Sequence, residues 1–216
     1  MHSPDHSRAY RRLGGLLGAW FFLLWAGLQS AAATSASTIL VFGDSLSASY
    51  GVPVERSWVT LLEKRLDIMD KPYRVINASI SGETTDGGVR RLPEVLARTK
   101  PALVILELGG NDGLRGFPLK VVQENLGRMV AAAQAADAKV LLVGMRIPPN
   151  YGKRYAEGFH QLYGLVADQH ESALVPFMLE EIAVKPELMQ DDLIHPRAEA
   201  QAQILDNIWP HLEPLL

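Results

Sequence analysis

The sequence predicts a single α/β domain built on a mostly parallel sheet. Short apolar runs that stop at glycine or polar residues alternate with longer segments in which apolar residues recur at helical spacing. Strands that alternate with helices in this way form βαβ units, whose strands run parallel. The length of 216 residues favours one domain with a sizeable core. In such sheets the functional loops follow the carboxyl ends of the strands.

Five apolar runs predict the strands. They cover residues 38–42, 73–76, 102–108, 139–143 and 173–175, and the run 102–108 is the clearest central strand. Helical spacing predicts the segments between and after them, at residues 58–66, 89–96, 120–136, 154–169 and from Pro196 onward. The last segment carries Ile204, Leu205, Ile208 and Trp209 on one face, and we expect Trp58 and Trp209 in the core.

Residues 1–33 have the pattern of a secretory signal peptide. Three arginines (8, 11 and 12) precede an uncharged apolar run at 13–28, and Ala31–Ala33 offers a small-residue cleavage site. The alternative is a retained membrane anchor, although a span needs about 20 apolar residues. We expect cleavage near Ala33, a periplasmic or secreted location, no stable membrane span after processing, and a mature domain at 34–216.

The composition narrows the chemistry that the domain can perform. A net charge of −3 argues against a nucleic-acid partner, because phosphate binding needs clustered Lys and Arg. The absence of cysteine excludes disulfides, thiol catalysis and cysteine metal sites. The histidines have no partner at metal-ligand spacing, and neither a Walker A sequence nor a dinucleotide-binding glycine motif follows a strand. We therefore expect no metal and no cofactor. The protein is also expected to be a monomer.

A candidate nucleophile, Ser45, follows the first predicted strand in Gly43-Asp44-Ser45. A serine that leaves a strand into a tight turn is exposed at the sheet edge, and glycine lets the backbone turn sharply. The alternative is a simple capping turn, because Asp and Ser are favoured at helix starts.

A candidate base, His195, lies in the segment 192–196 near the end of the chain. A serine hydroxyl is a poor nucleophile until a base takes its proton, and a carboxylate three residues before the histidine, Asp192, can fix its tautomer. Asp191 is the competing carboxylate, but its four-residue offset suits the role less well. Pro196 suits a first helical position, so we expect His195 at the start of the last helix. A surface histidine after an acidic loop is the alternative.

Candidate donors for an oxyanion hole follow two other strands. Asn111 comes after two glycines at the end of the central strand, and its side-chain amide can donate to a developing negative charge. Gly82, after the strand at 73–76, can offer a backbone N–H to the same place. Each segment alone also reads as an ordinary loop.

These motifs together resemble the SGNH, or GDSL, hydrolases. More narrowly, they resemble the bacterial periplasmic group of thioesterase I, lysophospholipase L1 and arylesterase. The matching segments are GDSLSASYG (43–51), VINASISGETT (75–85), ELGGNDGLRG (107–116), RIPPNYGKRY (146–155), VPFMLE (175–180) and MQDDLIHP (189–196). The resemblance runs from about Ile39 to Leu212, with departures at residues 48–51 and at Leu193.

The resemblance implies a flavodoxin-like three-layer α/β/α sandwich and a serine esterase. It implies that Ser45 attacks, that its N–H joins Gly82 and Asn111 in the oxyanion hole, and that Asp192 and His195 complete the triad. The expected substrates are small-molecule carboxylic esters and thioesters, among them acyl-CoA-type thioesters, lysophospholipids and aryl esters. The alternatives are a carbohydrate acetyl esterase and a non-catalytic acyl- or lipid-binding protein of the same fold.

The segment 113–118 follows Asn111 and is the candidate acyl-binding loop. Its glycines permit backbone rearrangement, while Leu114, Phe117 and Pro118 offer apolar surface. The alternative is a connecting loop whose apolar residues pack into the core, and the family resemblance favours the binding loop. Ile147 is a fourth expected substrate-binding residue, in the matching segment 146–155.

Overall fold

The computed structural model describes residues 36–216, so the expected signal peptide and its cleavage site lie outside the described residues. Within this range the chain forms a five-stranded sheet with the order β2-β1-β3-β4-β5, in which every neighbouring pair is parallel. The strands are β1 (Ser37–Gly43), β2 (Tyr73–Asn77), β3 (Leu103–Glu107), β4 (Lys139–Val143) and β5 (Ala173–Val175). The predicted parallel sheet is confirmed, because each strand forms within two residues of its expected bounds.

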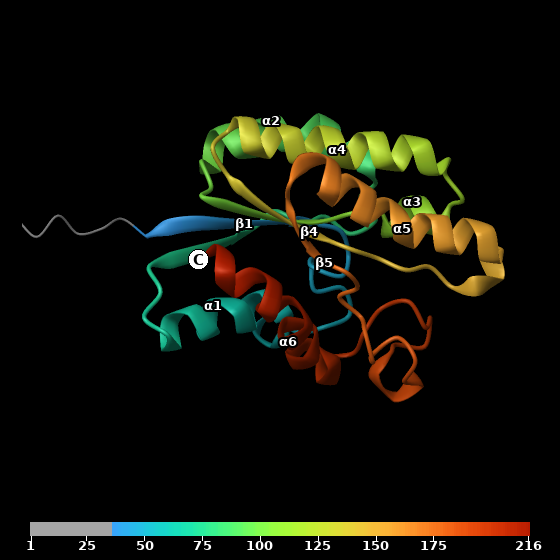
Figure 1. Cartoon of the computed structure of the whole chain (residues 1–216). Coiled ribbons are helices and arrows are strands. Elements are labelled where there is room, and N and C mark those ends of the chain that lie inside the picture. Colours follow the sequence, from blue (N-terminus) through green and yellow to red (C-terminus); the bar gives the residue numbers. More distant parts are fainter. Residues whose placement is uncertain (1–35) are drawn as a thin grey trace, which may run out of the picture. The chain divides into compact units, whose positions relative to one another are not determined.

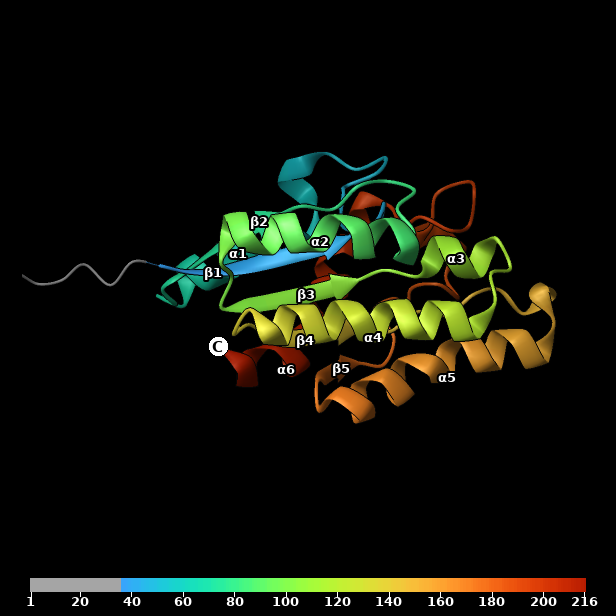
Figure 2. The same cartoon turned by 90° about the horizontal axis from the view of Figure 1, so that it is seen from above.

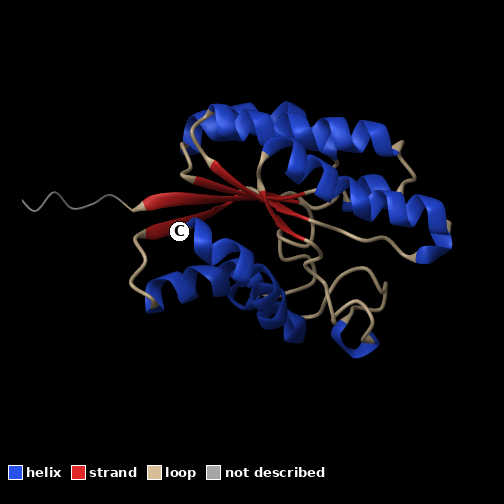
Figure 3. Cartoon of the chain, in the orientation of Figure 1, coloured by secondary structure: helices blue, strands red, loops and turns tan. Residues whose placement is uncertain are grey.

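Helices cover both faces of this sheet and make the expected three layers (Figures 1 and 3). One face carries α1 (Trp58–Ile68) and α6 (Gln201–Leu212), and the other carries α2 (Thr85–Thr99), α4 (Leu119–Ala135) and α5 (Lys153–His170). Seen from above, α2, α4 and α5 lie in a row over the strands (Figure 2). No helix of residues 36–216 has the length and apolar character that crossing a membrane requires.

The core explains why the central strands are almost wholly apolar. Residues 39–42 of β1 and 103–106 of β3 are buried on both faces, because helices pack above and below them. Trp58 is fully buried and its indole N–H donates to the carbonyl of Leu46, so this large side chain also satisfies its polar atom. Trp209 packs against the core but is only half-buried, beneath the guanidinium of Arg65, so the core prediction holds in full for Trp58 and in part for Trp209.

The last helix begins later than the sequence predicted. Helix α6 starts at Gln201, after a single 3-10 turn, whereas we expected a start at Pro196. Pro196 instead forms an isolated antiparallel bridge with Met189, and the N–H of Arg197 donates to the carbonyl of Leu188 at 2.7 Å. This pairing with the segment just before it in the chain overrides the local preference of proline for a first helical turn. His195 therefore lies in a loop and not at the mouth of a helix.

A short helix after β3 was not predicted. Helix α3 (Gly110–Leu114) occupies part of the segment that the sequence indicated as loop. Five residues span little more than one helical turn, which is too short to produce a recognisable 3.6-residue pattern. The helix matters because it carries Asn111 at its start and ends in the candidate acyl-binding loop.

Candidate active site

Ser45 lies in the turn that leaves the carboxyl end of β1, beside the end of β3. Gly43 and Glu107 are register partners there. A Cβ added to Gly43 would lie 2.5 Å from Glu107 Oε2 and 2.9 Å from the Glu107 carbonyl oxygen. Only glycine fits such a close approach, so the chain can turn tightly and present Ser45 at the sheet edge.

Ser45, His195 and Asp192 form a continuous hydrogen-bonded relay. His195 Nε2 lies 2.8 Å from Ser45 Oγ, and His195 Nδ1 lies 2.6 Å from Asp192 Oδ2. The hydroxyl can donate to Nε2 while Nδ1–H donates to the carboxylate, which is the tautomer that a general base needs. The structure thus brings together the three residues that the sequence predicted as catalytic.

The loop that carries His195 is organised by Asp192 itself. Asp192 Oδ1 accepts the backbone N–H groups of Ile194 at 2.9 Å and His195 at 3.0 Å. Partial burial raises the pKa of Asp192, but the hydrogen bonds from His195 and Ile194 have the larger combined effect and lower the pKa to about 2. The carboxylate is therefore ionised at neutral pH. Leu193 at the tip of the loop adopts φ 56°, a left-handed conformation that is uncommon for leucine.

Asp191, the competing carboxylate, points away from the relay. Its side chain is 99% exposed, and Asp191 Oδ1 lies 2.7 Å from Arg197 Nη2. The geometry therefore assigns the contact with the imidazole to Asp192.

Tyr50 is a site residue that the sequence analysis did not identify. Its ring centroid lies 4.5 Å from that of His195, at an interplanar angle of 42°, and about half of the residue is exposed. The side chain of Gln190 donates to the Tyr50 carbonyl at 2.9 Å, which ties this turn to the histidine loop. The only sequence signal was that residues 48–51 depart from the pattern of the resembling family.

The two other expected oxyanion residues lie at the ends of β2 and β3. Gly82 is exposed at φ 80°, where an added Cβ would meet no atom within 4 Å, so the constraint there is conformational. The amide of Asn111 donates to Asp44 Oδ2 and to the carbonyl of Glu83, both at 3.0 Å. Both amide hydrogens are therefore engaged in the structure, and a substrate oxyanion must share or replace one of these acceptors.

Two buried acids, Asp44 and Glu107, lie behind this hole and were also missed. The sequence did hold a signal, since Glu107 is the one charged residue of an otherwise apolar buried strand. Buried carboxyls are rare unless they are paired, so an acid in that position indicates an internal partner.

The predicted acyl-binding residues fall into three environments. Leu114 and Phe117 are half-buried against the core, and Pro118 is exposed at the start of α4. The Tyr155 hydroxyl donates to the Phe117 carbonyl at 2.6 Å, which anchors the loop to α5. Ile147 is only 7% exposed and packs beneath α3, so it supports the loop from below and offers substrate almost no open surface.

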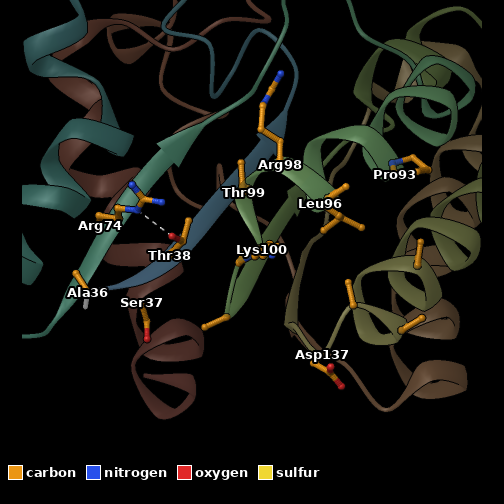
Figure 4. A pocket seen from close by; sticks show the side chains of 16 residues that line it. Ala36, Ser37, Thr38, Arg74, Pro93, Leu96, Arg98, Thr99, Lys100 and Asp137 are labelled. Atoms are coloured by element: carbon orange, nitrogen blue, oxygen red, sulfur yellow. Dashed lines mark hydrogen bonds between the residues drawn. The ribbon is translucent and has the colours of Figure 1, made fainter. Parts of the chain in front are cut away.

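A broad, open hollow lies at the opposite end of the strands. It is bordered by residues at the amino ends of β1 and β3, and Arg74, Arg98 and Lys100 line it (Figure 4). Arg74 Nε donates to Thr38 Oγ1 at 2.9 Å within it. The hollow contains none of the triad or oxyanion residues, so the chemistry belongs to the carboxyl edge.

Comparison with known proteins agrees with this geometry. The model of the GDSL-like lipase/acylhydrolase family matches residues 41–203. The chain is 54% identical over 182 residues to Esterase TesA of Pseudomonas aeruginosa, covering 84% of this chain and 90% of that protein. It is 43% identical over 184 residues to thioesterase 1/protease 1/lysophospholipase L1 of Escherichia coli K12, covering 85% and 87%.

A solved structure shows the same fold. The crystal structure of TesA superposes with a TM-score of 0.82 at 54% identity and covers 83% of this chain and all of that one.

Proposed function

Because the chain belongs to the GDSL-like lipase/acylhydrolase family and is a hydrolase acting on ester bonds, we propose that Ser45, His195 and Asp192 are its catalytic triad. The observation that carries this proposal is the chain of two hydrogen bonds through the imidazole. His195 Nε2 lies 2.8 Å from Ser45 Oγ, and His195 Nδ1 lies 2.6 Å from Asp192 Oδ2. A serine that shares a hydrogen bond with an oriented imidazole is an activated nucleophile.

The reaction proceeds through an acyl-enzyme on Ser45. His195 Nε2 takes the hydroxyl proton as Oγ attacks the acyl carbonyl, and the ionised Asp192 stabilises the imidazolium that forms. The imidazolium then gives its proton to the departing alcohol or thiol. Water, activated by the same imidazole, attacks the acyl-enzyme and releases the carboxylic acid. The low pKa of Asp192 keeps its charge in place throughout this cycle.

The oxyanion hole consists of the N–H groups of Ser45 and Gly82 and the side-chain amide of Asn111. These donors come from the ends of β1, β2 and β3, which are neighbours in the sheet. The parallel topology supports this assignment, because it brings the carboxyl ends of all strands to one edge.

The proposed substrates are small-molecule acyl esters and thioesters, including acyl-CoA-type thioesters, lysophospholipids and aryl esters. The names of the relatives, an esterase and a thioesterase/lysophospholipase, support this class. The half-buried apolar side chains of Leu114, the last residue of α3, and of Phe117, just after it, suit an acyl chain. We propose that the chain acts as a monomer in the periplasm or outside the cell, after removal of residues 1–33.

Labelling with a serine-reactive fluorophosphonate tests the proposal. The wild type should be labelled once, and Ser45→Ala should lose both labelling and ester hydrolysis, with an activity loss on the order of 10⁴- to 10⁶-fold. Ser37→Ala, at the opposite end of the same strand, is the matched control and should be labelled like the wild type. Retention of a tenth of the wild-type turnover by Ser45→Ala would remove Ser45 from the nucleophile role.

A further inference from the structure

Asp44 and Glu107 form a buried pair of acids directly behind the nucleophile turn. Asp44 is 2% exposed and Glu107 is fully buried. The backbone N–H of Asp44 donates to Glu107 Oε2 at 3.2 Å, and the Ser47 hydroxyl donates to the same oxygen at 2.6 Å. Neither acid takes part in the proposed proton relay, so their burial needs another explanation.

The carboxylate of Asp44 holds the Asn111 amide. Asp44 Oδ2 accepts from Asn111 Nδ2 at 3.0 Å, while Oδ1 accepts the N–H of Leu46 at 3.1 Å. The other acceptor of the amide is the neutral carbonyl of Glu83. A charged acceptor forms the stronger hydrogen bond, so Asp44 dominates the orientation of the amide.

At neutral pH the pair of acids holds one proton, so that one carboxyl is neutral and the other is ionised. Burial raises the pKa of Asp44 to about 6 and raises that of Glu107 well above its usual range, and repulsion from Asp44 adds to the shift of Glu107. The interaction between the two buried carboxyls lowers the pKa of Asp44 and raises that of Glu107, which favours the proton on Glu107. Glu107 Oε2 accepts both of the hydrogen bonds described above, whereas Glu107 Oε1 is buried without a hydrogen-bond partner among residues 36–216, so Oε1 is the oxygen free to carry that proton.

The groups that face Asp44 come from four elements. Glu107 faces it from β3, Asn111 from α3, and Tyr163 from α5, where its hydroxyl donates to the Leu108 carbonyl. His195 faces it from the catalytic loop, and its positive charge, when present, lowers the pKa of Asp44. Burial and the neighbouring acids raise the pKa of Tyr163 well above 10, so Tyr163 stays neutral in the working range.

We propose that Asp44 and Glu107 share a single proton and together position Asn111 for the oxyanion. This inference rests on the proposed function, because it assigns the aim of a donor in that oxyanion hole. Glu107 stays protonated and donates to Asp44, and the ionised Asp44 accepts from the amide of Asn111. Asp44 is thus a positioning residue that acts through Asn111 without touching the substrate.

The charge of Asp44 matters because the Asn111 side chain carries both a donor, its NH₂ group, and an acceptor, its carbonyl oxygen. An ionised carboxylate can only accept, so it selects the NH₂ group of Asn111 over the carbonyl oxygen. An asparagine at position 44 offers both a donor and an acceptor, so the Glu83 carbonyl alone would still require the NH₂ group of Asn111, and the orientation of the amide is weakened. A glutamine at position 107 reproduces the protonated glutamate, because its NH₂ can donate to Asp44 and its oxygen can accept from Ser47.

Two matched carboxyl-to-amide variants separate these roles. Asp44→Asn should lower kcat on the order of 10²-fold with little change in KM, as expected when an oxyanion donor is lost. Glu107→Gln should lower kcat by less than about 10-fold, because the glutamine keeps both a donor to Asp44 and an acceptor for Ser47. Unfolding temperatures of both variants show whether the fold is intact. Equal losses of kcat in two folded variants would overturn the single-proton pair, and full activity of Asp44→Asn would overturn the positioning of Asn111.

Nuclear magnetic resonance of the wild-type enzyme keeps the test independent of variant folding. The side-chain ¹⁵N resonance of Asn111 should titrate with a midpoint near the Asp44 pKa of about 6. A resonance that stays constant from pH 4 to 8 would refute the inference.

Fluorophosphonate labelling of the same wild-type samples separates the two proposals. A labelled enzyme whose Asn111 signal does not titrate refutes the positioning pair alone. An unlabelled enzyme refutes the proposed function.

Discussion

Replacing Gly113 with alanine should lower both the stability and the turnover of the enzyme. Gly113 lies in α3, two residues after Asn111, and faces the core. A Cβ built there would lie 2.7 Å from Ile147 Cγ2 and 2.7 Å from Phe159 Cε2. Both neighbours are buried, so neither can move freely out of the way.

The size of the effect follows from these distances. Ordinary contact begins at 3.4 Å, so α3 must move outward by about 0.7 Å, the difference between 3.4 and 2.7 Å. Overpacking of a well-packed core costs about 1–3 kcal/mol, which corresponds to a fall in Tm of about 2–12 °C for a domain of this size. Because Asn111 sits on the same helix, it shifts as well, and a displacement near 1 Å can cost about 10²-fold in rate. We expect kcat to fall about 10- to 100-fold.

Thermal unfolding by circular dichroism and steady-state hydrolysis of p-nitrophenyl butyrate measure the two effects. Gly164→Ala is the matched control, because a Cβ at Gly164 in the interior of α5 meets no atom within 4 Å. Alanine should stabilise that helix by about 1 kcal/mol and leave kcat unchanged. If Gly113→Ala keeps both Tm and kcat at the wild-type values, α3 does not pack closely against Ile147 and Phe159.

Four further predictions concern the individual site residues. Asn111→Ala should lower kcat by roughly 10²- to 10³-fold and change KM little, because the oxyanion exists only near the transition state. An effect confined to KM would instead assign Asn111 to ground-state binding. Asp192→Asn should lower kcat by about 10⁴-fold, because an asparagine favours the wrong imidazole tautomer. Asp191→Asn is the control and should leave kcat unchanged, because the Asp191 carboxylate faces solvent. Equal losses of kcat in the two variants would contradict the assignment of Asp192. Because the pKa of Asp192 is about 2, loss of wild-type activity between pH 7 and 5 must come from other groups, and a profile of kcat against pH checks this. Leu114→Ala should lower kcat/KM for octanoyl esters far more than for acetyl esters, because each methylene of the acyl chain buried against the loop contributes about 0.8 kcal/mol to binding. Equal losses across chain lengths would instead mean that the loop supports the oxyanion hole.

The parts of the fold that were predictable depend on local patterns. Strand β3 is apolar because it is buried on both faces, and this burial appears directly in the sequence as a run of large apolar residues. Ser45 was identifiable for a similar reason, since a glycine and two polar residues end such a run. The parallel arrangement then places strand-end motifs together without any knowledge of their contacts.

The features that were missed depend on contacts between distant residues. Asp44 and Glu107 are 63 positions apart, so nothing local shows that the two acids meet. Pro196 satisfies a local rule for helix starts, but its bridge to Met189 decides its conformation. Tyr50 reaches the ring of His195 only through the fold of two separate loops. Ile147 follows a strand as the motif suggested, yet packing under α3 removes it from the surface.

The self-contained turn of residues 192–195 has a consequence for how the active site can drift over evolutionary time. The acid and the base belong to one turn, whose two backbone hydrogen bonds end on the same carboxylate that orients the imidazole. Substitutions elsewhere in the domain therefore move base and acid together as one unit, and their mutual geometry is insulated from remodelling of the scaffold. The scaffold sets the position of this unit relative to Ser45. Surrounding loops can diversify toward new acyl groups while the proton-transfer machinery remains assembled.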